Sequence, residues 1–179
     1  MSSALINAVR SAVAREDVLA AVAAVYDDVQ RAINERRPIC EMSGRCCKFE
    51  EYGHRLYVST LELAAFVAGR ERESDQRGTM NDERQSTSSL IIHRSSLPTG
   101  CPFQVGKLCS VHTIRPFGCR MFFCDTTATD WQQAMYEQFH SRLKAMHDEL
   151  GVDYFYVEWR AALRELDLSP NDEIRNPNK

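Results

Sequence analysis

Seven cysteines are the side chains of this sequence best suited to chemistry, and all lie in the middle of the chain. Cysteine thiolates bind zinc and iron strongly, and metal ligation can fix irregular backbone where a hydrophobic core is missing. The segment from Cys101 to Cys124 is rich in Pro, Gly and Cys, so little else would make it rigid. The candidate metal ligands are therefore Cys40, Cys46, Cys47, Cys101, Cys109, Cys119 and Cys124.

Two other interpretations of the cysteines are weaker. Stable disulfides are disfavoured because the number of cysteines is odd and the first 15 residues do not resemble a secretion signal, which makes the reducing cytoplasm the expected location. A transient redox disulfide stays open. Free cysteines can pack as small hydrophobic residues, but such residues would also be expected in the flanking helical regions. One or two of the seven could still be of this kind.

The spacing leaves the metal open between zinc and an iron–sulfur cluster. Cys-x5-Cys-Cys followed by Cys-x7-Cys-x9-Cys-x4-Cys lacks the Cys-x2-Cys pairs of zinc fingers and reproduces neither ferredoxin pattern. His112, three residues after Cys109, would be an eighth ligand and could complete two four-coordinate sites. In extended backbone the adjacent Cys46 and Cys47 would point apart, so they would serve different ions or only one would ligate.

Two arginines beside the cysteines are expected to support such a site. Arg115 and Arg120 lie close to Cys119 in the sequence. A guanidinium there could donate hydrogen bonds to metal-bound thiolates and offset their negative charge. Neither arginine is expected to ligate the metal itself.

Helical patterns lie on both sides of the cysteine region. Apolar residues recur at three- and four-residue steps over residues 2–37, which predicts one or two helices with a break near residues 15–17 and an end at Pro38. A second such pattern over residues 129–168 predicts C-terminal helices, the first begun by a capping box of Thr129 and Gln132 and ended by Gly151. Residues 152–157 could equally begin as a strand.

The central region should contain one short strand and one docked helix. Residues 52–58 suit a strand, and Ser59 with Glu62 forms a capping box that predicts a helix from about Thr60, with Gly69 as its left-handed cap. Residues 70–89 are polar and predict a mobile loop.

We therefore expect a mostly α-helical single domain over residues 1–179. Its N-terminal helical region (1–37) and C-terminal helices (129–168) would surround an irregular, cysteine-rich metal-binding centre (38–124) with at most a small sheet. The catalytic residues, if any, are not identified by these patterns.

Composition excludes several functional classes. The 179 residues hold 22 Lys and Arg against 25 Asp and Glu, a net charge of −3, so there is no general basic field for nucleic acid. The apolar stretch over residues 18–26 is too short to cross a bilayer, so membrane insertion is not expected. A cytoplasmic protein fits these features, and a protein partner stays open.

The combined cysteine pattern resembles the YkgJ-type cysteine-cluster family, also described as a zinc- or iron-chelating domain of CxxCxxCC type. The resemblance covers about residues 38–124 and the aromatic stretch 154–159, and Ser43 stands where that family's usual motif has its second cysteine. The motifs that carry it are Cys40-x2-Ser43-Gly44-x-Cys46-Cys47, Cys101-Pro102-Phe103, Gly106, Cys109-Ser110-Val111-His112, Arg115-Pro116 and Cys119-Arg120.

What the resemblance implies is zinc, iron or iron–sulfur binding in a small cytoplasmic protein of bacterial type, with Cys124 as a compensating ligand. Related sequences include flagellin lysine methylases. A metalloenzyme, either redox-active or similar to a protein lysine methyltransferase, is therefore the alternative function. The chain shows no glycine-rich loop after a strand for S-adenosylmethionine.

Overall fold

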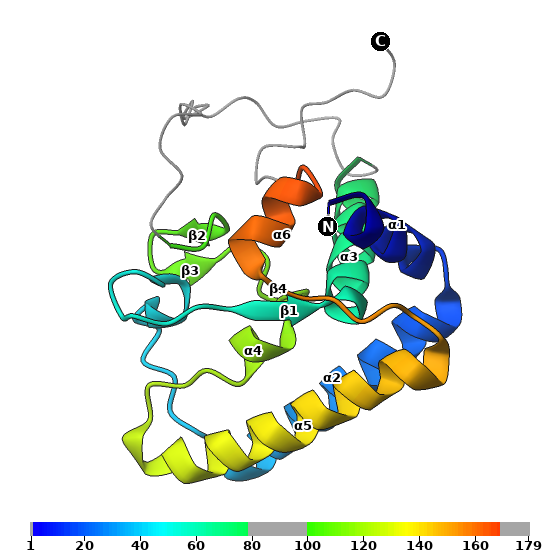
Figure 1. Cartoon of the computed structure of the whole chain (residues 1–179). Coiled ribbons are helices and arrows are strands. Elements are labelled where there is room, and N and C mark those ends of the chain that lie inside the picture. The colour runs from blue at the N-terminus through cyan, green and yellow to red at the C-terminus, as the bar shows by residue number, and fades with distance from the viewer. Residues whose placement is uncertain (1, 79–99, 169–179) are drawn as a thin grey trace.

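A computed structural model describes residues 2–78 and 100–168 of the chain, and this part is mostly helical (Figure 1). The described residues form six α-helices and two very small sheets, so the predicted mostly α-helical class is confirmed. None of the described helices is long and apolar enough to cross a membrane. The helices are α1 (Ser2–Val13), α2 (Glu16–Arg36), α3 (Thr60–Gly78), α4 (Phe117–Arg120), α5 (Thr129–Leu150) and α6 (Trp159–Glu165).

The N-terminal region forms two helices, which is one of the two arrangements that the sequence allows. The break falls between Val13 and Glu16, where Arg15 pairs with Asp17 at 2.7 Å instead of continuing the helix. The second helix ends before Pro38, with Arg37 in the left-handed region at φ 53°. Valines at three- and four-residue steps (Val18, Val22, Val25 and Val29) form the buried stripe of α2.

The capping box at the start of α3 is confirmed. The Ser59 backbone N–H donates to Glu62 Oε2 at 2.8 Å, and the Glu62 backbone N–H donates to Ser59 Oγ at 3.4 Å. The reciprocal bonds satisfy two backbone donors at the helix start. The three residues before the helix form β1 (Tyr57–Ser59), so the predicted strand exists but is shorter than residues 52–58, because residues 52–56 form turns and loop.

The predicted end of this helix at Gly69 is wrong, and so is the loop predicted from residue 70. The helix continues to Gly78, since its Arg, Glu, Asp and Gln residues can all adopt helical backbone. Gly69 instead allows close packing, because a Cβ there would lie 2.6 Å from Ile114 Cγ2. The rest of the predicted loop, residues 79–89, lies outside the described residues.

Both sheets have two antiparallel strands. β1 pairs with β4 (Tyr156–Glu158), with Val58 opposite Val157, so the centre of the chain is joined to its C-terminal part. β2 (Gln104–Val105) and β3 (Leu108–Cys109) form a hairpin through Gly106, whose φ of 62° suits glycine. Each sheet has only two short strands, which confirms the expectation that β-structure is small.

The C-terminal helix α5 ends at Gly151 in the left-handed conformation, as predicted. Its predicted capping box does not form. Thr129 Oγ1 donates to the Thr126 carbonyl, and Gln132 Oε1 accepts from the Phe123 backbone N–H at 3.0 Å. The 3-10 turn η2 (Thr126–Ala128) precedes the helix and is capped by Asp125, so the chain enters α5 already helical.

Two apolar clusters make up the core. One lies among α2, α3 and α5, and α2 runs alongside α5 in Figure 1. The other surrounds Trp159, Phe66 and Phe103, and it also includes the buried Cys47 and Cys101. The cysteine region is therefore part of a packed core and not a separate arm of the molecule.

Glu62 joins these parts of the fold. It is 2% exposed, and its Oε1 accepts from the Phe117 backbone N–H at 3.0 Å while Oε2 caps α3. Burial raises the pKa of this carboxyl, and the bonds from Ser59 and Phe117 oppose the rise. One carboxylate thus fixes the first residues of both α3 and α4.

Replacing Glu62 with Gln should lower the free energy of unfolding by about 2 kcal/mol, because the amide group can accept at only one of the two backbone donors. In a chain of this size that corresponds to a melting temperature lower by about 6 °C, measurable by circular dichroism. Glu149→Gln, at an exposed position on α5, is the matched control and should melt like the wild type. Equal melting of the two variants would contradict this role of Glu62.

Candidate metal centre

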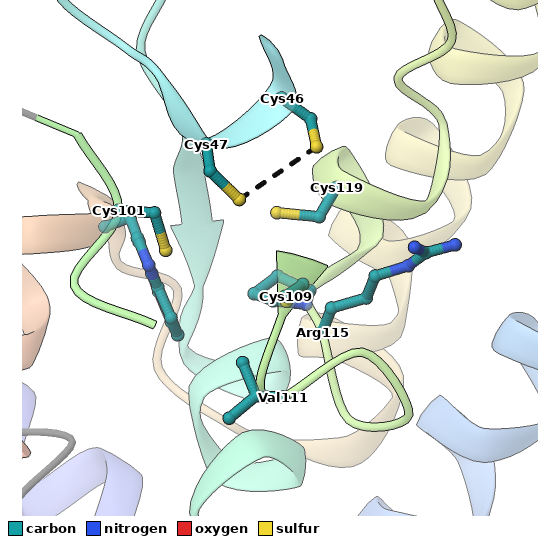
Figure 2. A pocket seen from close by; sticks show the side chains of 9 residues that line it. Cys46, Cys47, Cys101, Cys109, Val111, Arg115 and Cys119 are labelled. Atoms are coloured by element: carbon teal, nitrogen blue, oxygen red, sulfur yellow. Dashed lines mark hydrogen bonds between the residues drawn. The ribbon is translucent and has the colours of Figure 1, made fainter. Parts of the chain in front are cut away.

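Five of the seven cysteines line one small cavity. Its volume is about 20 Å³, and its other lining residues are Val111, Arg115, Pro116 and Trp159. Figure 2 shows the sulfur atoms of Cys46, Cys47 and Cys119 facing a common space, with Cys101 and Cys109 at its sides. The five come from the turn at residues 45–47, from residue 101, from β3 and from α4.

A 3-10 turn, η1 (Arg45–Cys47), brings Cys46 and Cys47 to the same side. Their sulfurs lie 4.0 Å apart. The expectation that they point apart is wrong, because it assumed extended backbone and the chain here turns tightly. Gly44 makes the turn possible with φ 74°, and its carbonyl accepts the Cys47 backbone N–H at 3.1 Å.

The Cys101 segment lies directly against this turn. The Cys101 backbone N–H donates to the Cys47 carbonyl at 2.6 Å. A Cβ on the preceding Gly100 would lie 2.5 Å from that same oxygen. Only glycine therefore allows the two cysteine segments to come so close without a shift of the backbone.

The remaining two cysteines are placed by the hairpin and by α4. Cys109 lies opposite Gln104 in the β2–β3 pair. Cys119 lies in the single turn of α4, whose first N–H is held by Glu62. Both side chains are half-buried, whereas Cys47 and Cys101 are buried.

Two buried N–H groups at the cavity have no hydrogen-bond acceptor among the described residues. They are Arg115 Nε and Trp159 Nε1, and Trp159 is only 1% exposed. Leaving such a donor unpaired costs about 1–3 kcal/mol, so an acceptor is expected here. Thiolate sulfur carrying negative charge would be a suitable acceptor for both.

The thiols influence one another strongly. Hydrogen bonding with Cys47 lowers the pKa of Cys46 to about 6, that of Cys109 to about 7, and that of Cys101 as well. The pKa of Cys47, which shares its proton with these neighbours, is raised. Burial raises the pKa of Cys119. The charge of Arg115 further favours the thiolates of Cys46 and Cys109.

Three candidate ligands lie away from this cavity. Cys40 is exposed, and Cys124 Sγ lies 3.4 Å from Ser43 Oγ. His112 is exposed and does not line the cavity. The structure thus brings together five of the eight candidate ligands, but not Cys40, Cys124 or His112.

The two candidate supporting arginines differ in position. Arg115 lines the cavity, as expected. Arg120 does not, and it donates instead to the carbonyls of Arg115 at 2.9 Å and Thr113 at 2.7 Å. It therefore holds the segment that carries Arg115.

Sequence reasoning missed the position of Trp159. Its apolar spacing indicated only a core residue, and its aromatic ring does pack against Phe66 at 4.8 Å between centroids. The position of the indole N–H at the cavity depends on long-range pairing. The Trp159 backbone N–H donates to the Leu56 carbonyl at 2.9 Å, next to the pairing of β1 with β4. No local pattern in the sequence signals this contact.

The cysteine side chains that line the cavity are not arranged as metal ligands in this structure. Within residues 2–78 and 100–168, no group of three or more His, Cys, Asp and Glu side chains is positioned to hold an ion. The cysteine donors fit zinc or iron chemically, and the unpaired N–H donors fit the negative charge of metal-bound thiolates. Binding would therefore require the thiols to turn about their Cα–Cβ bonds.

Comparison with known proteins gives no assignment. No protein-family model, curated protein or solved structure matches the chain.

The metal-free protein should show one unusually reactive thiol. Since the pKa of Cys46 is lowered to about 6, its thiolate should predominate above that pH and be lost below it. Alkylation by iodoacetamide, followed by peptide mass spectrometry from pH 5 to 9, should give half-maximal labelling of Cys46 near pH 6. Arg115→Gln should move that midpoint upward, and an unchanged midpoint would contradict the contribution of the guanidinium.

Proposed function

We propose that this chain is a metal-binding protein whose five clustered cysteines hold one metal ion. Zinc is the first candidate for that ion. The observation that carries the proposal is the enclosed cavity lined by Cys46, Cys47, Cys101, Cys109 and Cys119. Four thiolates complete a tetrahedral zinc site, so one of the five would remain as a neighbour or alternative ligand. The ion would cross-link segments that the backbone alone holds through few hydrogen bonds.

The separation of the first two sulfurs supports this geometry. With zinc–sulfur bonds of about 2.3 Å, two ligands of a tetrahedral site lie about 3.8 Å apart. The Cys46 and Cys47 sulfurs are 4.0 Å apart, so this pair requires little adjustment. Two of Cys101, Cys109 and Cys119, which line the same cavity, would supply the remaining ligands after their side chains turn toward the ion.

The size of the cavity favours a single ion with a structural role. A volume of 20 Å³ is comparable to the space that one water molecule requires, about 10–15 Å³. A substrate beside the ion would need more room, so a closed four-thiolate site is the best fit. An iron–sulfur cluster on the same cysteines is the second candidate, favoured by the two buried N–H donors, because such hydrogen bonds set cluster potentials.

The deciding experiment is elemental analysis with a visible absorption spectrum on protein purified without oxygen. Zinc at one equivalent in a colourless protein would support the first candidate. Iron with acid-labile sulfide in a brown protein would support the second. Folded protein without metal, which also fails to bind added zinc, would overturn both.

Loss of two cavity cysteines should remove both metal and stability. The double variant Cys101→Ser/Cys119→Ser leaves three of the five thiols, so it should bind less than about a tenth of the wild-type metal and melt at a lower temperature, because metal binding and folding are coupled. Cys40→Ser, at an exposed position outside the cavity, is the matched control and should keep full metal content and melting temperature. Equal metal content in the double variant and in Cys40→Ser would place the ligands elsewhere.

The Trp159 N–H should stabilise the negative charge of the metal-bound thiolates. In Trp159→Phe the donor is lost, so metal affinity should fall about tenfold. The thiolate-to-cobalt absorption band of the Co(II)-loaded protein should move to longer wavelength, since the sulfur electrons are less stabilised. Phe66→Leu damages the same core without removing an N–H, and it should lower the melting temperature without moving the band.

A further inference from the structure

A second and much larger cavity lies on the other side of the segment that carries Cys119. Its volume is about 330 Å³, and it lies between α2, α3 and the segment 113–120. That size is at the lower end of the range for small-molecule sites, about 300–1,000 Å³. We call it the α2–α3 groove.

One wall of the α2–α3 groove is apolar. Leu19 and Val22 of α2 face Ala65 and Ala68 of α3 across it. Ile114 closes one end, seated against Gly69, where a Cβ would lie 2.6 Å from its side chain. Small residues on α3 thus leave a space that larger side chains would fill.

The polar side of the groove holds the guanidinium of Arg120, which forms no direct ion pair. Arg120 is partly buried there and stacks over the Tyr26 ring at 4.2 Å, and its Nε and one terminal nitrogen donate to backbone carbonyls. No carboxylate forms an ion pair with Arg120 in the part of the chain that the structure describes, although the charge of Asp27 acts on it from farther away. A partly buried guanidinium without a carboxylate in direct contact favours an anion from outside.

Two further charges line the α2–α3 groove. Arg72 of α3 is exposed and adds a second guanidinium, while the exposed Asp27 of α2 supplies one negative charge. The lining therefore carries one net positive charge, which one negative charge on a ligand would neutralise. Guanidinium groups bind carboxylates through strong, paired hydrogen bonds.

From this combination we propose that the α2–α3 groove binds a small organic carboxylate with an apolar body. The carboxylate lies at Arg120 and Arg72, and the hydrocarbon part covers Leu19 and Ala65. The site is independent of the metal proposal, since none of its lining residues is a cysteine.

The test is a titration of the full-length protein with hexanoate, followed by calorimetry. Hexanoate should bind saturably at one site. Acetate should bind at least tenfold more weakly, because it lacks the methylene groups that cover the apolar wall. Hexylamine should not bind, because it carries the wrong charge.

Two variants outside the core locate the binding. Arg72→Gln removes the exposed cation and should weaken hexanoate about tenfold. Ala23→Leu, at an exposed position lining the α2–α3 groove, should fill the space and weaken binding to a similar extent. Arg10→Gln, on α1 and away from the groove, is the matched control and should bind like the wild type.

The proposal fails if the wild type shows no saturable binding, if hexylamine binds as well as hexanoate, or if Arg72→Gln and Ala23→Leu bind like Arg10→Gln. Inorganic phosphate that competes as strongly as hexanoate would also overturn it, since the anionic group alone would then explain the affinity. Melting curves of the variants, measured in parallel, establish that any loss of binding is not a loss of folding.

Discussion

The buried carboxylate of Glu62 is the interaction on which the site depends most. Burying a carboxylate to 2% exposure costs free energy. Here each carboxylate oxygen accepts a hydrogen bond from a backbone N–H, one from Ser59 and the other from Phe117. The first bond fixes where α3 begins. The second fixes α4, and Cys119 follows two residues later. The position of one wall of the cysteine cavity therefore depends on the same carboxylate that starts the central helix.

The segment from Val111 to Arg120 separates two spaces of different character. Val111, Arg115 and Cys119 line the cysteine cavity, whereas Thr113, Ile114 and Arg120 line the α2–α3 groove. The side chain of Arg120 also holds the carbonyls of Thr113 and Arg115. Arg120 therefore lines the α2–α3 groove and at the same time holds the backbone that carries Arg115.

Much of the fold was predictable from the sequence because its signals are local. The break near Arg15, the capping box of Glu62 and the glycine end of α5 each depend on a few neighbouring residues. The end of α3 was predicted wrongly because Gly69 serves a contact with Ile114, far away in sequence. The cysteine region was predictable as a cluster. That Cys40 and Cys124 lie outside the cavity, and that Trp159 lies beside it, depends on long-range packing that spacing does not encode.

The pairing of β1 with β4 also sets the order in which the protein can mature. Trp159 begins α6 and is held by the Leu56 carbonyl, so the indole reaches the cavity only after the chain has been synthesised through α5. Contacts between such distant segments form late, because a long loop must close first. On the ribosome, the thiols of Cys46, Cys47, Cys101, Cys109 and Cys119 would emerge before the residue that encloses them. During synthesis they are therefore more open to oxidants than in the folded protein, where Trp159 lines the cavity that they share.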